Sequence, residues 1–145
     1  MISFTDVTKV YPGGTTAVGG LTLTAPTGKI TVLVGPSGCG KTTSLRMINR
    51  MIEPTSGLIT IDGRDTANLN ANELRRGIGY VIQSGGLFPH RTIVDNIATV
   101  PLLLGWGRAK ARAEALELLE RVGLAPELAN RYPNQLSGGQ QQRVG

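Results

Sequence analysis

The sequence predicts an α/β fold that also contains an antiparallel β part and a helical region. Three observations predict it. Residues 30–34 (ITVLV) are almost all apolar or β-branched, which is typical of a strand buried on both faces in a parallel sheet. A glycine-rich loop and an apolar stripe with helical spacing follow this run directly. Alternating strand patterns come before it, and long helical periodicity comes after it.

The β-rich part is predicted from three segments. Residues 2–11 and 17–25 alternate apolar and polar side chains, as half-exposed strands do, and each ends at a turn rich in proline and glycine. Residues 58–61 are a third short strand that runs into an Asp-Gly turn.

A helix is predicted over residues 41–51. Leu45, Ile48 and Ile52 form its apolar stripe, and Pro54 ends it.

Two shorter elements follow this helix. Asn70, with Glu73 three residues later, has the pattern of a capping box and predicts a short helix that ends near Arg76. Residues 78–82 have the composition of another buried strand.

Helical periodicity begins at Thr92. Glu117 and Arg121 are spaced i,i+4 on the polar side of the main helix, and Gly123 is expected to end it. The opposite, apolar face consists of Ala115, Leu118, Leu119 and Val122.

Composition excludes several classes of protein. Hydrophobic residues at 40% and charged residues at 17% fit a globular chain and not a disordered one. The net charge of +5 includes no run of Lys or Arg longer than two, so we expect a solvated basic face and no nucleic-acid partner. The single cysteine, Cys39, excludes an internal disulfide and fits a reducing cytosol. No signal peptide is expected, and the most apolar stretch, residues 97–106, is too short to span a bilayer.

The loop at residues 35–42 matches the phosphate-loop pattern, in which a glycine and four further residues precede Gly-Lys-Thr. Glycines allow successive backbone N–H groups to face phosphate oxygens, and the N-terminus of the following helix adds a partial positive charge. We expect the Lys41 ammonium to reach the β- and γ-phosphates and the Thr42 hydroxyl to ligate Mg²⁺. The predicted phosphate contacts are Gly35, Pro36, Ser37, Gly38, Cys39, Gly40, Lys41, Thr42 and Thr43.

A second candidate anion site is the pentapeptide LSGGQ at residues 136–140. Ser137 can cap a helix whose first turn carries Gly138 and Gly139, which leaves backbone N–H groups uncovered by side chains. The two predicted phosphate-binding helix ends lie about 95 residues apart. This separation indicates two copies of the chain that share nucleotide across an interface.

In this order and separation, the two motifs resemble the Walker A and signature motifs of the ATPase domains of ABC transporters. The resemblance implies the P-loop NTPase fold, with a RecA-like parallel sheet core, an antiparallel β subdomain and a helical subdomain. The implied nucleotide-binding α/β core with its antiparallel part covers residues 1–86, and the helical subdomain covers residues 87–137. Residues 136–145 then hold the signature motif and the start of the following helix.

The resemblance also implies ATP and Mg²⁺ as cofactors and assigns further residues. Tyr11 corresponds to the aromatic residue that stacks on adenine, and Val18 to a small apolar contact beside adenine and ribose. Gln83 corresponds to the glutamine that contacts Mg²⁺ and the region of the attacking water, which makes Gln83 and Lys41 the catalytic candidates. The residues expected to meet the γ-phosphate of ATP held by a partner subunit are Ser137, Gly138, Gly139 and Gln140.

Residues 79–101 (GYVIQSGGLFPHRTIVDNIATVP) and the segment RYPNQLSGGQQQRVG resemble the ATPases of bacterial osmoprotectant importers, those for glycine betaine, carnitine or choline. ATPases of importers for polar amino acids or other small solutes remain the alternative. The resemblance implies a homodimer of ATPase subunits at the cytoplasmic face of the membrane. Its other partners would be transmembrane permease subunits and an extracytoplasmic solute-binding protein.

The sequence also departs from the family pattern. Gly145 is reached before the Walker B strand and the switch histidine of the family, and His90, which precedes the signature, is not that histidine. We therefore expect these 145 residues by themselves to fold poorly and to hydrolyse ATP negligibly. A nucleotide-binding fragment without hydrolysis stays open as a second interpretation, and an ABC protein that acts on DNA or ribosomes is a third.

Overall fold

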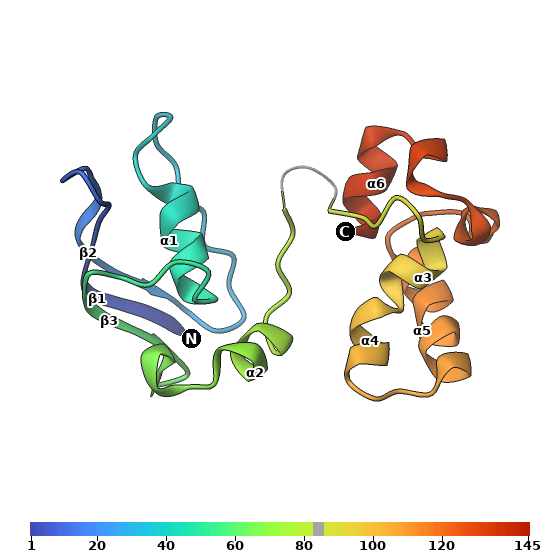
Figure 1. Cartoon of the computed structure of the whole chain (residues 1–145), viewed down its shortest axis with the longest axis horizontal. Coiled ribbons are helices and arrows are strands. Elements are labelled where there is room, and N and C mark those ends of the chain that lie inside the picture. The colour runs from blue at the N-terminus through green and yellow to red at the C-terminus, as the bar shows by residue number, and fades with distance from the viewer. Residues whose placement is uncertain (83–85) are drawn as a thin grey trace. The chain divides into compact units, whose positions relative to one another are not determined.

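The computed structural model describes residues 1–82 and 86–145. The chain forms two compact units, Met1–Gly79 and Tyr80–Gly145 (Figure 1). The first contains the sheet and the phosphate loop, and the second is helical. None of the helices in the described residues has the length and apolar character of a membrane span.

The first unit is built on a four-stranded antiparallel sheet in the order β2-β1-β3-β4. Its strands are β1 (Ile2–Val10), β2 (Thr16–Ala25), β3 (Ser56–Ile61) and the short β4 (Arg64–Asp65). The two strands expected from alternating patterns and the short third strand before the Asp-Gly turn are confirmed. In the register, Phe4 of β1 lies opposite Leu23 of β2 and Ile59 of β3.

Helix α1 (Lys41–Ile48) packs on this sheet, and Ile48 and Ile52 of the predicted stripe contact its core. Met47 is fully buried among Phe4, Val7, Val18 and Ile59, whereas Leu45 is 47% exposed. The expected stripe of Leu45, Ile48 and Ile52 is therefore wrong at Leu45. The buried positions Ser44 and Met47 are three residues apart, so they lie on one side of the helix.

The expectation of buried strands at residues 30–34 and 78–82 is also wrong. Neither segment is a strand, and Ile30, Val32 and Val34 are 94%, 71% and 88% exposed. A parallel strand exists only as part of a hydrogen-bonded ladder. The sheet of the described residues contains only β1 to β4, and it offers neither segment such a partner.

Two short helices follow the sheet in the first unit. The 3₁₀ helix η1 (Thr66–Asn68) precedes α2 (Ala71–Arg76), which ends where the sequence predicts. The Asn70 side-chain oxygen accepts hydrogen bonds from the backbone N–H groups of Asn72 and Glu73, at 2.9 and 3.2 Å, so the predicted N-cap is confirmed.

The second unit is a small helical assembly with its own core. Its α-helices are α3 (Ile93–Ile97), α4 (Thr99–Leu103), α5 (Arg108–Arg121) and α6 (Gly138–Val144), with 3₁₀ helices η2 (Pro126–Asn130) and η3 (Pro133–Gln135) between α5 and α6. The buried side chains include Ile93, Val94, Ala98, Ala111, Ala115, Leu119, Leu124, Ala129 and Leu136.

Helix α5 largely follows its predicted pattern. Ala115 and Leu119 are buried, and Gly123, with φ of 69°, comes just past the end of the helix. Val122 is 39% exposed, which corrects its assignment to the apolar face. Val122 is the C-cap residue and departs from helical geometry, so the helical spacing no longer controls where its side chain lies.

Candidate nucleotide-binding site

The phosphate loop has a backbone that only glycine adopts easily. Gly38 and Gly40 have φ of 83° and 92°. The Cys39 N–H donates to the Pro36 carbonyl at 3.4 Å and closes a turn over residues 36–39. The loop and the first residues of α1 line a pocket of about 260 Å³. The residues that line it are Ser37, Gly38, Cys39, Gly40, Lys41, Thr42 and Thr43.

Gly40 joins the loop to the sheet. A Cβ atom at this position would lie 2.4 Å from the Ala17 carbonyl oxygen and 2.9 Å from Val18 Cγ2, so no larger residue fits without displacing β2. Sequence reasoning missed Ala17, because a contact between a strand and a loop more than twenty residues later leaves no local pattern. Val18, which was predicted from the family resemblance, is buried in the core of the first unit and lies against Gly40 of the loop.

The N-terminus of α1 is left open toward the pocket. No side chain caps it, and its first turn contains no acidic residue. The first N–H groups of an α-helix have no intrahelical acceptor and carry a partial positive charge. This end of α1 is therefore suited to an anion such as phosphate.

Lys41 folds back over the loop. Its Nζ donates hydrogen bonds to the carbonyl oxygens of Gly35 and Pro36, both at 2.7 Å, and contacts Cys39 Sγ at 3.4 Å. An ammonium has three donors, and thiol sulfur is a weak acceptor. A phosphate oxygen can therefore replace the sulfur contact while both carbonyl bonds remain.

Gly35 and Cys39 also pack on each other. A Cβ atom on Gly35 would lie 2.7 Å from Cys39 Sγ, so the thiol occupies the space that a side chain at position 35 would need. The Cys39 residue is exposed.

Thr42 is an exposed residue in the first turn of α1. In the described residues, no group of three or more His, Cys, Asp or Glu side chains could hold a metal ion. A Mg²⁺ ion typically takes one or two protein ligands together with phosphate oxygens and water. The Thr42 hydroxyl fits this type of site, whereas Gln83, the other predicted metal ligand, lies outside the described residues.

Tyr11 directly follows β1 and is 36% exposed. Its backbone N–H bonds to the Thr15 carbonyl at 2.9 Å, and the Lys9 ammonium lies 5.4 Å from its ring centroid. The exposed ring is available for stacking. In the part of the chain that the structure describes, no hydrogen bond joins Tyr11 to residues 35–43.

The signature segment belongs to the second unit and forms the start of α6. Ser137 Oγ accepts a hydrogen bond from the Gln140 N–H at 3.3 Å, and Gln140 Oε1 accepts one from the Ser137 N–H at 2.9 Å. This reciprocal capping box brings Ser137 and Gln140 together, as the sequence predicts for the cap. Leu136, which is buried, anchors the segment in the helical core.

Gly138 and Gly139 leave the start of α6 uncovered. A Cβ atom on either residue would meet nothing within 4 Å, so both face open space. Gln141 holds the opposite side of the turn through bonds from its Nε2 to the carbonyls of Pro133 and Leu136, at 2.8 and 3.1 Å. The start of α6 is therefore held by these hydrogen bonds, and its backbone at Gly138 and Gly139 is not covered by side chains.

The chain is similar to curated transport proteins. It is 53% identical over all 145 residues to the "Glycine betaine/carnitine/choline transport ATP-binding protein OpuCA" of Bacillus subtilis, of which it covers 38%. It is 50% identical over 145 residues to the "Glycine betaine uptake system ATP-binding protein YehX" of Escherichia coli, of which it covers 47%. The "Fe(3+) ions import ATP-binding protein FbpC" of Brucella abortus is 47% identical over 143 residues, and 39% of it is covered. The chain thus spans less than half the length of these relatives.

A solved structure has the same fold. The dimeric post-hydrolysis state of the ATP-binding cassette MJ0796, bound to ADP and Pi, matches with a TM-score of 0.87 and 37% identity. The match covers 99% of this chain and 66% of that one, and it confirms the expected P-loop NTPase fold class. The family model described as "ABC transporter" matches residues 18–145. This chain, with its glycine-rich loop, open helix start and capped LSGGQ segment, therefore belongs to the ABC transporter family of ATP-binding domains.

Proposed function

We propose that the chain is the ATP-binding part of an ATP-hydrolysing subunit that powers an importer for quaternary-ammonium osmoprotectants such as glycine betaine, choline or carnitine. The main support for nucleotide binding is the uncapped N-terminus of α1, which offers backbone N–H groups to an anion. It follows the loop whose backbone depends on Gly38 and Gly40. The solute class is supported by the names of the Bacillus subtilis and Escherichia coli relatives, which are 53% and 50% identical to this chain.

The residues of the loop bind and orient the triphosphate. Backbone N–H groups of Gly35 and of residues 37–43 surround the phosphates, and Lys41 adds a positive charge while its carbonyl bonds hold the loop closed. The Thr42 hydroxyl ligates Mg²⁺, which neutralises charge on the phosphate oxygens when it is bound. Phosphoryl transfer to water depends mainly on such positioning and charge neutralisation. We assign Gln83 to the region of the attacking water.

The signature segment meets the nucleotide of a second copy. Ser137 Oγ accepts from Gln140 and still has its own hydroxyl proton to donate to a phosphate oxygen. The open N–H groups of Gly138 and Gly139 add two further donors. Two copies that face each other would bind two ATP molecules between them, so that closure depends on the γ-phosphate.

The remaining partners follow from the transport role. We propose permease subunits in the membrane, which hold the ATPase at the cytoplasmic face, and an extracytoplasmic protein that selects the solute. The ATPase subunits transmit closure to the permease through residues 83–101. No nucleic acid is among the proposed partners.

ATPase assays on the complete protein that contains these residues test the enzymatic assignment. We expect Mg²⁺-dependent ATP hydrolysis that Lys41→Ala abolishes and that Lys29→Ala, a charge-matched change at an exposed residue, leaves intact. ATP binding without any turnover would instead support the interpretation of a nucleotide-binding protein that does not hydrolyse.

Transport assays test the solute class. Proteoliposomes that contain the complete importer should take up radiolabelled glycine betaine, choline or carnitine when ATP is supplied inside. Uptake of iron or of a polar amino acid in place of these solutes would contradict the osmoprotectant assignment. The similarity to the Brucella abortus protein makes iron a necessary comparison in this assay.

A further inference from the structure

The C-terminal end of α1 is bound by two arginines. The helix ends in a Schellman motif, in which the Met51 N–H bonds to the Arg46 carbonyl at 3.0 Å and the Arg50 N–H bonds to the Met47 carbonyl at 3.2 Å. Glycine is the usual residue at the left-handed position of this motif. Here that position is Arg50, with φ of 55°. Arg50 thus has a backbone conformation that costs free energy for a residue with a side chain.

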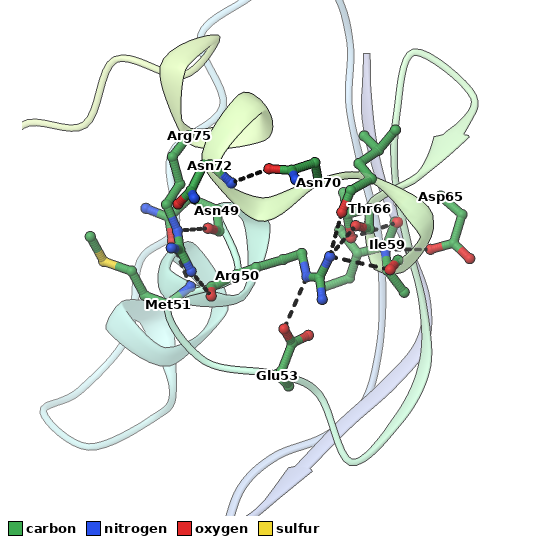
Figure 2. A network of polar contacts seen from close by, with 12 residues as sticks. Asn49, Arg50, Met51, Glu53, Ile59, Asp65, Thr66, Asn70, Asn72 and Arg75 are labelled. Carbon is green, nitrogen blue, oxygen red and sulfur yellow. Dashed lines mark hydrogen bonds and ion pairs between the residues drawn. The ribbon is translucent and has the colours of Figure 1, made fainter. Parts of the chain in front are cut away.

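The Arg50 guanidinium joins the end of α1 to the segment that follows β4. Its Nη1 donates to the carbonyl oxygens of Thr66, Ala67 and Leu69 at 3.2, 3.2 and 2.7 Å, and its Nε bonds to Glu53 Oε1 at 2.9 Å. Figure 2 shows the side chain extended from α1 to this set of acceptors. The Arg50 side chain is only 19% exposed, so water competes weakly for these bonds.

Arg75 of α2 binds backbone carbonyls at the same end of α1. Its Nε donates to the Asn49 carbonyl at 3.0 Å, and its Nη2 donates to the Arg50 carbonyl at 2.5 Å (Figure 2). The last carbonyls of a helix lack intrahelical partners and carry a partial negative charge, which a guanidinium stabilises. Asn49, which is buried, accepts the Met51 N–H through its side chain and completes the cluster.

These contacts tie α1 to the sheet at both ends. At its start, Gly40 lies against Ala17 of β2. At its end, Arg50 binds η1, and Thr66 of η1 donates from Oγ1 to the Ile59 carbonyl of β3 at 3.1 Å. An eight-residue helix is only about 12 Å long, so a tilt at one end displaces the N–H groups at the other.

We propose that Arg50 and Arg75 are positioning residues for the nucleotide phosphates. They hold the C-terminal end of α1 so that the N–H groups at its start keep the arrangement that phosphate requires. This inference rests on the proposed nucleotide-binding function. It assigns the two arginines no contact with the nucleotide.

Calorimetric titration of the complete protein with ATP tests this role. Arg50→Gln and Arg75→Gln should each raise the Kd for ATP by about 3- to 10-fold, a size typical of coupling between linked sites. Arg46→Gln on α1 and Arg76→Gln on α2 remove the same charge from exposed residues whose side chains make no hydrogen bond within the described part of the chain. These controls should change the Kd by less than about twofold.

The unfolding temperature without nucleotide separates positioning from stability. A displaced loop raises the Kd at a near-native unfolding temperature, whereas reversible partial unfolding raises the apparent Kd only together with a lower unfolding temperature. Arg50→Gly adds a second variant, because it removes the guanidinium but favours the left-handed backbone, and it should fold even where Arg50→Gln does not. We expect a near-native unfolding temperature with a raised Kd.

Two outcomes would overturn the inference. If the wild-type protein binds ATP and folded Arg50→Gly and Arg75→Gln bind it within twofold of the wild-type Kd, the two arginines do not position the phosphates. If the wild-type protein itself binds no ATP, the proposed function fails, and this inference fails with it.

Discussion

Gly40 lies so close to Ala17 that a single added carbon atom would come within 2.4 Å of the Ala17 carbonyl oxygen. This contact ties the start of the phosphate-loop helix to β2, in a position where φ is 92°. Two independent constraints, one on backbone conformation and one on space, therefore require glycine here.

Gly40→Ala should consequently destabilise the protein more than an alanine at another left-handed glycine. Gly13 has φ of 95° with nothing within 4 Å of its would-be Cβ, so Gly13→Ala measures the conformational cost alone. We expect Gly40→Ala to lower the free energy of unfolding by about 1–3 kcal/mol more than Gly13→Ala, as overpacking does. Urea denaturation of both variants measures the difference. Equal losses of unfolding free energy in the two variants would show that β2 shifts without a measurable cost.

Lys41→Ala should weaken ATP binding by about 2–3 kcal/mol, because it removes a charged donor to phosphate. It also removes the bonds that Nζ makes to the carbonyls of Gly35 and Pro36. Titration calorimetry with ATP measures the change, and Lys29→Ala is the control. Unchanged affinity in Lys41→Ala would contradict the role given to this ammonium.

Cys39→Ala should have little effect on ATP affinity. The Cys39 sulfur is the weakest of the three contacts of Lys41 Nζ, at 3.4 Å, and a phosphate oxygen is expected to replace it. We expect a change of less than about 0.5 kcal/mol in ATP binding, the usual range for an exposed substitution. A large loss of affinity would show that the thiol contact persists in the bound state.

Gly139→Ala separates the proposed binding role of the signature segment from its fold. A Cβ atom at Gly139 meets nothing within 4 Å, and alanine favours a helix over glycine by up to about 1 kcal/mol, so thermal stability should hold or rise. The same Cβ would cover backbone N–H groups that a partner's phosphate needs. ATP-dependent dimerisation, followed by analytical ultracentrifugation, should therefore weaken.

Gln142→Ala is the control for this experiment, because Gln142 is an exposed residue of the same helix outside the signature pentapeptide. Dimerisation of Gly139→Ala at the wild-type ATP concentration would argue against the role proposed for this helix start.

Asn96→Ala should loosen the segment before α3. The Asn96 side chain accepts the Phe88 N–H at 2.7 Å and donates to the carbonyls of Phe88, Arg91 and Thr92 at 3.2, 3.1 and 2.9 Å. Loss of this set should cost about 1–3 kcal/mol of stability and raise amide hydrogen exchange at residues 88–92. Exchange at the wild-type rate in Asn96→Ala would show that these bonds do not order the segment.

Local patterns predicted the elements that local interactions stabilise. The alternating strands β1 and β2, the short strand β3 and the Asn70 cap are confirmed, since their pairing partners and capped N–H groups lie within the first unit. The expected buried strand at residues 30–34 is wrong, because an apolar composition reports a tendency to be buried and does not supply the partner. Helical periodicity likewise failed to separate Leu45 from Met47, which lie two positions apart.

The candidate site divides in the same way. The loop and the LSGGQ segment were found from sequence because their function requires specific residue types at fixed spacing, and their phosphate-binding role stays a prediction. The sequence did not predict the contact of Gly40 with Ala17, or the hydrogen bonds that Arg50 and Arg75 make at the end of α1. These contacts join residues up to 26 positions apart, and nothing in the local sequence marks them.

The most direct test is a structure of the complete protein with Mg²⁺ and a non-hydrolysable ATP analogue. We expect a dimer in which N–H groups of residues 37–43 of one copy and of Gly138 and Gly139 of the other lie within hydrogen-bond distance of the same triphosphate. A triphosphate bound away from residues 35–43 would contradict the proposed function. So would a dimer in which the LSGGQ segment lies far from the triphosphate.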